Sequence, residues 1–303
     1  MTSVVYVVGT GRSGSTVLDT LLGSHPRAVS TGELSHLVRD GWMGIEICAC
    51  GKAVVECPHW MTVRAAWTAQ FGEGAVPEYP ALQRSVERLR RVPGFILGSR
   101  RVQGEWERYQ QLTRGLFRAI IEATDRDVII DSSKNPVRAL ALSRAGIELR
   151  LIHLVRDPRA VAWSFGKSFT RDRAGGVQRD RAGTAAWRSA LKWQLINAEA
   201  RLVTHRMPAN RSMTVRYEDL VTHPRATLDR IGRLINLNLE EVAAAAEAGR
   251  PVVIGHPVAG NRLRMSGMVS LAGDDEWRRA MPQGDQRLVS ILAQPSMRTF
   301  GYR

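Results

Sequence analysis

The sequence contains little of what marks membrane, secreted or fibrous proteins. Its 303 residues include only three cysteines, and apolar runs such as Val4 to Val8 are short. A membrane-spanning helix needs roughly 18 consecutive apolar residues, so we expect no transmembrane segment. We also expect no secretory leader, because no basic segment followed by an apolar stretch opens the chain. These absences predict a globular protein, with the cytoplasm as its expected location.

Lysine is also scarce, although the chain is strongly basic. Lys+Arg total 43 against 29 Asp+Glu, and only four of the 43 are lysines, which leaves 39 arginines. GC-rich coding produces such an arginine excess, so part of the formal charge of +14 needs no functional explanation. The remainder attracts anions. No basic stripe with interleaved aromatic residues marks a nucleic-acid track, so we expect no nucleic-acid partner, and a nucleic-acid or membrane-surface binder is the less favoured alternative.

Short apolar runs alternate with longer helical patterns, as is typical of a parallel sheet covered by helices on both faces. Strands are expected at 4–8, 128–130, 149–155 and 213–215. Helices are expected at 15–23, 60–71, 81–92, 104–124, 137–145, 158–168, 184–206, 225–236 and 239–248. We therefore predict a three-layer α/β sandwich with a mostly parallel central sheet. We expect one domain over residues 1–303, with a mainly helical insertion at about 60–124.

A glycine-rich loop, GTGRSGST at residues 9–16, joins the first expected strand to the first expected helix. Its glycines let backbone N–H groups converge, and the helix N-terminus adds partial positive charge, which suits a phosphate or sulfate group. The loop is P-loop-like, but Ser15 stands where the nucleotide-hydrolase motif G-x-x-x-x-G-K-[ST] places its lysine. An anion site is therefore expected, with an ordinary tight turn, or a kinase or nucleotide hydrolase, as the alternatives.

A second candidate anion site follows the strand expected at 149–155. Arg156 begins the segment RDPRAVAWSF, and the expected helix starts at Pro158. Arg156 therefore lies at the carboxyl end of a strand, where open α/β sheets bind ligands, and Ser164 can face the same side. Alone, the segment is equally consistent with a capped helix start and a surface ion pair. Beside the first loop, it favours a second anion site.

Together these segments resemble the sulfotransferases that use 3′-phosphoadenosine-5′-phosphosulfate (PAPS). GTGRSGST is similar to their 5′-phosphosulfate loop, and HLVRDPRAVAWSF to their 3′-phosphate element. Further similar segments are STGELSHL (30–37), DSSKNPVRAL (131–140), VRYEDLVTHP (215–224) and GNRLRMSG (260–267). The resemblance implies transfer of a sulfuryl group from PAPS to a hydroxyl group of a carbohydrate, lipid or other small metabolite. It identifies neither that acceptor nor the oligomeric state.

The resemblance also implies roles for individual residues. The 5′-phosphosulfate would be held by the first loop, the 3′-phosphate by Arg156 and Ser164, and the adenine would lie near Tyr217. Asn261 and Arg264 would close over the cofactor from the C-terminal segment. The implied cofactor-binding residues are Gly11, Arg12, Ser13, Gly14, Ser15, Thr16, Arg156, Ser164, Tyr217, Asn261 and Arg264. The arginine in the first loop, where soluble small-molecule sulfotransferases usually carry lysine, places the chain closer to the bacterial, carbohydrate and protein-tyrosine branches.

The implied reaction needs stabilisation of negative charge and a base for the acceptor hydroxyl. Arg12 and Lys134 suit the electrostatic task, so no metal is required. Glu33 matches the glutamate base of the protein-tyrosine branch, and His36 is the competing base. The alternatives are a helix-start carboxylate for Glu33 and a surface cation for Lys134. We expect Asp131 to cap or orient the loop that carries Lys134.

The three cysteines occur close together in CACGKAVVECPHW, as Cys48, Cys50 and Cys57, followed by His59. Three cysteines and a histidine can form a tetrahedral zinc site, but this spacing departs from the usual C-x₂-C knuckle. An odd cysteine count also fits one disulfide with a free thiol, or three reduced thiols. We expect structural cysteines, reduced or paired, and no metal; zinc is the less favoured hypothesis.

Overall fold

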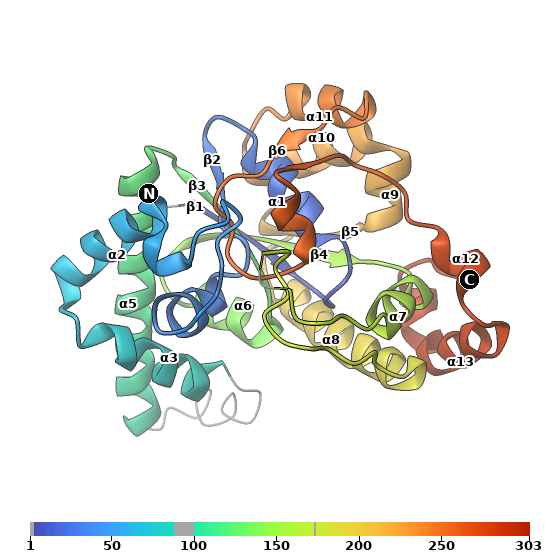
Figure 1. Cartoon of the computed structure of the whole chain (residues 1–303), viewed down its shortest axis with the longest axis horizontal. Helices are drawn as coiled ribbons and strands as arrows, with labels where there is room; N and C mark the ends of the chain where they lie inside the picture. Colours follow the sequence, from blue (N-terminus) through green and yellow to red (C-terminus); the bar gives the residue numbers. More distant parts are fainter. Residues whose placement is uncertain (1–2, 88–99, 173) are drawn as a thin grey trace.

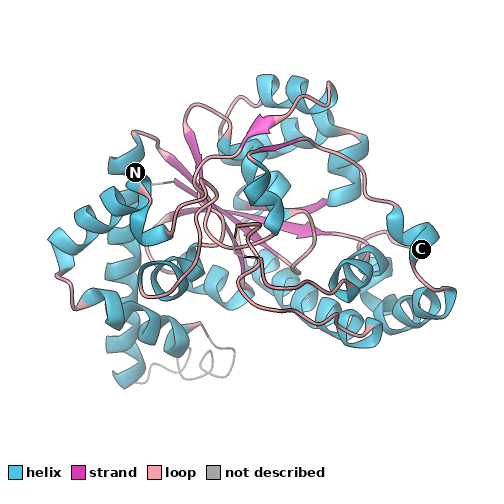
Figure 2. Cartoon of the chain, in the orientation of Figure 1, coloured by secondary structure: helices cyan, strands magenta, loops and turns pink. Residues whose placement is uncertain are grey.

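The computed structural model describes residues 3–87, 100–172 and 174–303. At its centre lies a five-stranded parallel sheet in the order β2-β3-β1-β4-β5 (Figure 2). Its strands are β1 Ser3–Val8, β2 Ala28–Ser30, β3 Val128–Lys134, β4 Glu148–Val155 and β5 Ser212–Arg216. A small antiparallel pair joins β6 Val252–Val253 to β7 Met268–Val269.

Helices surround the central sheet (Figure 1). Those described before residue 167 are α1 Ser15–Gly23, α2 Pro58–Phe71, α3 Ala75–Val86, α5 Arg100–Thr124, α6 Pro136–Ser143 and α7 Pro158–Gly166. The others are α8 Ala186–Arg206, α9 Tyr217–Thr222, α10 Pro224–Ile235, α11 Glu240–Glu247, α12 Glu276–Ala280 and α13 Gln283–Thr299. Within the described part of the chain, none of these helices is both long and apolar enough to cross a membrane.

The side chains of β1 divide the core into two layers, because successive residues of a strand point to opposite faces of the sheet. Val4, Tyr6 and Val8 pack in one buried cluster with α2, α3, α5 and α6. Val5 and Val7 pack in a second cluster with α1, α10 and α11. Figure 1 shows these helix groups on opposite sides of the strands. The predicted three-layer, P-loop-like α/β architecture is confirmed.

Several elements differ from the sequence-based expectation. The helix expected at 81–92 is α3, which begins at Ala75 and ends at Val86; residues 88–92 lie outside the described part of the chain. β2 was not expected, because three residues are too few to show a strand pattern. The last two helices were also missed, and α13 contains Gly284 and Pro295, which normally interrupt a helical pattern. The single domain with a helical insertion stays a prediction.

Candidate functional site

The carboxyl ends of the five parallel strands bring the predicted site residues to one edge of the sheet. Glu33 follows β2, Lys134 ends β3, and the loop 9–14 follows β1; Arg156 follows β4, and Tyr217 follows β5. A cavity of about 1030 Å³ opens at this edge. The predicted residues that line it are Gly11, Arg12, Gly14, Ser15, Thr16, Glu33, His36, Lys134, Arg156, Ser164, Tyr217 and Asn261.

The glycine-rich loop fits closely between its neighbours. Gly14 has a left-handed backbone (φ 87°), and its carbonyl accepts the backbone N–H groups of Val17 and Leu18 at 3.0 and 3.1 Å. A Cβ atom at Gly14 would overlap the ring of Tyr217, so only glycine fits here. The Ser13 side chain is buried, and its hydroxyl has no hydrogen-bond partner among the described residues. An unsatisfied buried hydroxyl at a helix N-terminus suits an anionic ligand.

Arg12 is the cation of this loop, and its backbone is also left-handed (φ 69°). Its guanidinium lies 5.9 Å from the ring centre of Phe165 and 6.0 Å from that of Phe169. Within the described ranges, no carboxylate forms an ion pair with it. Burial and the nearby charge of Arg181 lower the pKa of Arg12. A bound anion would therefore offset both the desolvation of the Arg12 guanidinium and its repulsion by Arg181.

Arg156 links the loops that follow β1 and β4. One guanidinium nitrogen donates to the carbonyl of Arg12 at 3.1 Å, and another lies 2.8 Å from a carboxylate oxygen of Asp274. The guanidinium also lies 4.8 Å from the ring centre of Tyr217, whose hydroxyl donates to the carbonyl of Ala272. In this structure the carboxylate of Asp274 therefore pairs with the arginine that the resemblance assigns to the 3′-phosphate.

Glu33 lies between a cation and an imidazole. The ammonium of Lys134 is 2.6 Å from one carboxylate oxygen, and Nε2 of His36 is 3.7 Å from the other. Nδ1 of His36 in turn lies 2.5 Å from a carboxylate oxygen of Asp40. The two candidate bases are therefore adjacent, and both line the cavity.

Buried polar groups hold the end of β3 that carries Lys134. The backbone N–H of Ser133 donates to a carboxylate oxygen of Asp131 at 3.0 Å, and Arg138 contacts the other oxygen at 3.3 Å. Asp131 therefore contacts the segment it was expected to orient, but this segment is the end of a strand and not a loop. Lys134 itself has a left-handed backbone (φ 67°) and donates to the carbonyl of Ser132 at 3.1 Å. Such uncommon backbone geometry outside glycine points to a functional constraint on Lys134.

The two residues of the C-terminal segment have different surroundings. Asn261 lines the cavity and caps the short helix Arg262–Ser266, accepting from the N–H of Leu263. Arg264 is buried outside the cavity lining, where it contacts Glu46 at 2.5 Å and the carbonyl of Ile47 at 3.2 Å. Arg264 therefore anchors this segment, and its predicted direct contact with a cofactor has no support from this geometry.

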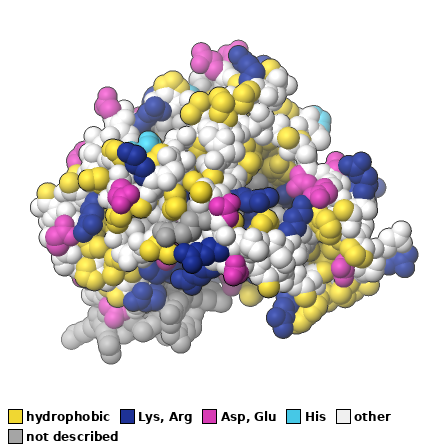
Figure 3. Space-filling model, in the orientation of Figure 1, with side chains coloured by type: hydrophobic (Ala, Val, Ile, Leu, Met, Phe, Trp, Pro, Cys, Tyr) yellow, Lys and Arg dark blue, Asp and Glu magenta, His cyan; other side chains and the backbone are white. Residues whose placement is uncertain are grey.

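Sequence reasoning missed four charged residues of the cavity: Arg181, Lys192, Glu199 and Asp274. Among the described residues that line the cavity, five are cations and three are carboxylates; the cations are Arg12, Lys134, Arg156, Arg181 and Lys192, and the carboxylates are Glu33, Glu199 and Asp274. Figure 3 shows Lys and Arg side chains gathered around the centre of one face, with carboxylates beside them. The scarcity of lysine was the one signal that could have singled out Lys192. Arg181 and Asp274 lie in loops without a motif, and Glu199 lies on α8.

Comparison with known proteins agrees with this geometry. A model of the sulfotransferase family matches residues 4–241. The chain belongs to the sulfotransferase family. No curated protein matched the sequence.

Solved sulfotransferase structures share the fold. The sulfotransferase domain of the Synechococcus PCC 7002 olefin synthase is 22% identical, with a TM-score of 0.50 over 100% of this chain and 97% of that one. The sulfotransferase domain from the curacin biosynthetic pathway is 18% identical, with a TM-score of 0.52 over 97% of this chain and 98% of that one. Sulfotransferase STF9 from Mycobacterium avium is 11% identical, with a TM-score of 0.50 over 100% of this chain and 78% of that one.

Proposed function

We propose that this sulfotransferase moves the sulfuryl group of PAPS to a hydroxyl group of a carbohydrate, lipid or other small metabolite. The proposal rests on two cationic sites in the cavity, Arg12 after β1 and Arg156 after the adjacent strand β4. A donor with a phosphosulfate at one end and a 3′-phosphate at the other needs two such sites. The unsatisfied hydroxyl of Ser13 and the cation of Arg12 suit the first, and Arg156 with Ser164 suits the second.

When bound, PAPS would supply the sulfuryl group and leave as 3′-phosphoadenosine 5′-phosphate (PAP). Glu33 would take the proton of the acceptor hydroxyl as the acceptor oxygen bonds to sulfur and the bond from sulfur to the oxygen of the 5′-phosphate breaks. Arg12 and Lys134 both line the cavity and would offset the negative charge that develops. These two cations supply that charge from the chain itself, so the proposal requires no catalytic metal.

The donor assignment is tested by calorimetric titration of PAP into the full chain, in buffer that contains EDTA. Arg12→Ala and Arg156→Ala should each weaken PAP binding about 10- to 100-fold, because a hydrogen bond to a charged group is worth about 1.5–3 kcal/mol. The matched control is Arg27→Ala. Arg27 is exposed, pairs with Asp127 and lies before β2, at the opposite edge of the sheet.

Unchanged PAP affinity in both cavity variants would overturn the donor assignment, and loss in the control as well would show a general effect of removing arginine. Magnesium-dependent turnover of ATP would favour the kinase alternative.

The acceptor class is tested with labelled PAPS against a panel of hydroxylated sugars, lipids, phenols and small metabolites. Absence of label transfer to every member of the panel, in protein that still binds PAP, would contradict the proposed acceptor class.

A further inference from the structure

Four potential metal ligands meet outside the catalytic cavity: Cys48, Cys50, Cys57 and His256. Their three sulfur atoms and one imidazole nitrogen all lie within 4.8 Å of one another. Three of the ligands come from one short segment, and the fourth comes from near the other end of the chain. None of the four lines the cavity described above.

Four of the six ligand-to-ligand distances are close to the edges of a tetrahedron around zinc, and the other two are within 4.8 Å. Zinc–sulfur bonds of about 2.3 Å and zinc–nitrogen bonds of about 2.0–2.1 Å place tetrahedral ligands about 3.8 Å (S to S) and about 3.6 Å (S to N) apart. Sγ of Cys57 lies 3.6 Å from Sγ of both Cys48 and Cys50. Nδ1 of His256 lies 3.6 Å from Sγ of Cys48 and 3.3 Å from Sγ of Cys57.

A disulfide explains this arrangement less well. All three cysteines are free, and a disulfide would need a sulfur separation of about 2.05 Å. A disulfide would also join only two of the sulfur atoms and would give no role to the imidazole nitrogen directed at them. Three thiols and one imidazole that converge on one point form the usual Cys₃His set of structural zinc sites.

The backbone presents these ligands from three separate positions. Cys48 and Cys50 lie in a tight turn, in which the N–H of Gly51 donates to the carbonyl of Cys48 and Gly51 is left-handed (φ 86°). Cys57 directly precedes α2. The carbonyl of His256 accepts from the indole N–H of Trp60 at 2.8 Å, which fixes the fourth ligand against the same helix.

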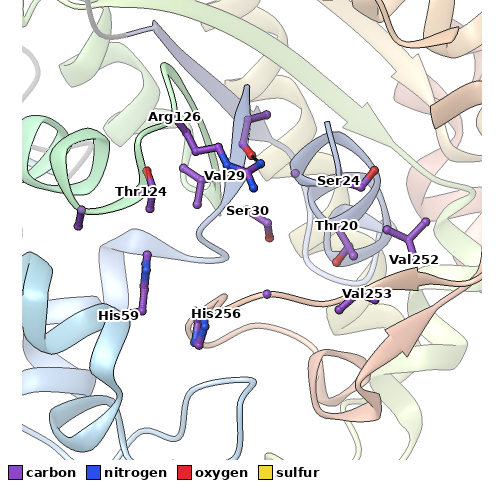
Figure 4. Close-up of a pocket in the computed structure, with 14 residues that line it drawn as sticks. Thr20, Ser24, Val29, Ser30, His59, Thr124, Arg126, Val252, Val253 and His256 are labelled. Atoms are coloured by element: carbon purple, nitrogen blue, oxygen red, sulfur yellow. Dashed lines mark hydrogen bonds between the residues drawn. The ribbon is translucent and has the colours of Figure 1, made fainter. Parts of the chain in front are cut away.

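The sequence spacing suggested His59 as the fourth zinc ligand, but the structure places His256 there instead. The ring of His59 stacks on that of His256 with centres 5.0 Å apart and planes at 13°, and His59 does not join the four-ligand cluster. Figure 4 shows His59 and His256 beside each other at a pocket of about 560 Å³, which Thr20, Ser24 and Ser30 also line. His59 is therefore a support for the ligand ring, and the two histidines form a matched pair for experiment.

We propose that Cys48, Cys50, Cys57 and His256 bind one structural zinc ion. Four protein ligands fill the tetrahedron and leave no open position for substrate, as in structural zinc sites. The zinc is separate from the proposed chemistry, which needs no metal. Its binding free energy adds to the free energy of folding, because the unfolded chain holds no preformed site.

The zinc would fix the C-terminal segment against the segment that carries Glu33. Val258, two residues after His256, accepts from the backbone N–H of Glu33 at 2.8 Å and donates to the carbonyl of Thr31 at 3.0 Å. Val258 also forms a bridge with Cys48. The metal would thus join the cysteine segment to the segment of His256 and Val258, and Val258 connects both to the segment that carries the proposed base.

The experiment measures bound metal in the full chain without a histidine tag, purified under reducing conditions and dialysed after incubation with zinc. Mass spectrometry with inductively coupled plasma should find one zinc per chain. His256→Ala should lose most of this zinc, whereas His59→Ala should retain it. Chelation should lower the thermal midpoint of the wild type and of His59→Ala, but not that of His256→Ala.

If His256→Ala does not fold, cobalt(II) substitution in the wild-type chain still decides the proposal. Tetrahedral thiolate ligation gives intense visible d–d bands and a thiolate-to-cobalt charge-transfer band, and zinc should bleach both. An octahedral cobalt spectrum, bound iron in place of zinc, or no metal together with a disulfide in the mass spectrum would overturn the proposal. Equal zinc in folded His256→Ala and wild type would overturn the ligand set.

Discussion

The ammonium of Lys134 lies 2.6 Å from a carboxylate oxygen of Glu33, and the two side chains are only 16% and 14% exposed. This contact follows from strand pairing, because β2 and β3 are parallel neighbours with Ser30 opposite Ile130. Glu33 and Lys134 both come a few residues after the stretch in which β2 and β3 pair with each other. The sheet therefore places a cation directly beside the proposed base, at the edge where the cavity opens.

We expect Glu33→Gln to lower kcat about 10²- to 10⁴-fold, the usual contribution of general base catalysis. The amide keeps the size of the side chain but cannot take a proton. PAP affinity, measured by calorimetry, should stay within a few-fold of wild type. The comparison variant is His36→Gln, whose imidazole lies next to Glu33. Full activity in Glu33→Gln with loss in His36→Gln would identify the histidine as the base.

Asp274→Asn should tighten PAP binding about two- to fivefold. The Asp274 carboxylate now pairs with Arg156 at 2.8 Å and must give up this partner when a phosphate binds. Partly exposed ion pairs are worth about 0.2–1 kcal/mol, which sets the size of the gain. Asp275→Asn is the control, because Asp275 pairs with Arg278 instead. Weaker PAP binding in Asp274→Asn would mean that the carboxylate helps to build the site.

Gly14→Ala should destabilise the chain more than Gly249→Ala, by about 1–3 kcal/mol in denaturant unfolding, and should also abolish PAP binding. Both glycines are left-handed, with φ of 87° and 61°, and Gly249 ends a helix in the usual left-handed cap, so both variants incur a similar backbone cost. Only at Gly14 would the added methyl group meet the Tyr217 ring; nothing lies within 4 Å at Gly249. Equal unfolding free energies in the two variants would refute the close contact with Tyr217.

Asp19→Asn should gain stability relative to wild type as the pH rises. Burial raises the pKa of Asp19 to about 7, while hydrogen bonds from Ser132 and Gly32 oppose this effect. In the unfolded chain the pKa of an aspartate carboxyl is about 3.9. The contribution of Asp19 to the free energy of unfolding is therefore fully present below about pH 3.9 and is lost as the pH rises through the folded pKa of about 7. The difference in unfolding free energy should change by an amount on the order of 4 kcal/mol between about pH 4 and 8.

The control for this experiment is Asp127→Asn, whose dependence on pH should have the opposite sign. The hydrogen bond from Arg27 lowers the pKa of Asp127, so its contribution is present at neutral pH and is lost as the pH falls. The effect should be small because this pair is exposed. An unchanged difference between wild type and Asp19→Asn across the range would contradict the raised pKa.

Features encoded by neighbouring residues were predictable. The loop at 9–16, the capped helix start at Pro158 and the apolar strands all depend on local spacing, and the family resemblance adds the roles of the cations. Element ends were less predictable, as α3 shows, because packing against α5 decides where that helix lies. Arg181 and Asp274 could not be found in advance, since they lie in loops whose course depends on the rest of the fold.

The sequence by itself determined a parallel α/β fold with a glycine-rich loop after the first strand and an arginine at the end of β4, because residue periodicity and motif spacing are local properties. Only the tertiary structure decided which distant residues meet: Asp274 at Arg156, Lys134 at Glu33, and His256 rather than His59 at the cysteines. These contacts join segments far apart in the chain. Strand order and helix packing set the distances between these side chains, and neither can be read from the spacing of residues in the sequence.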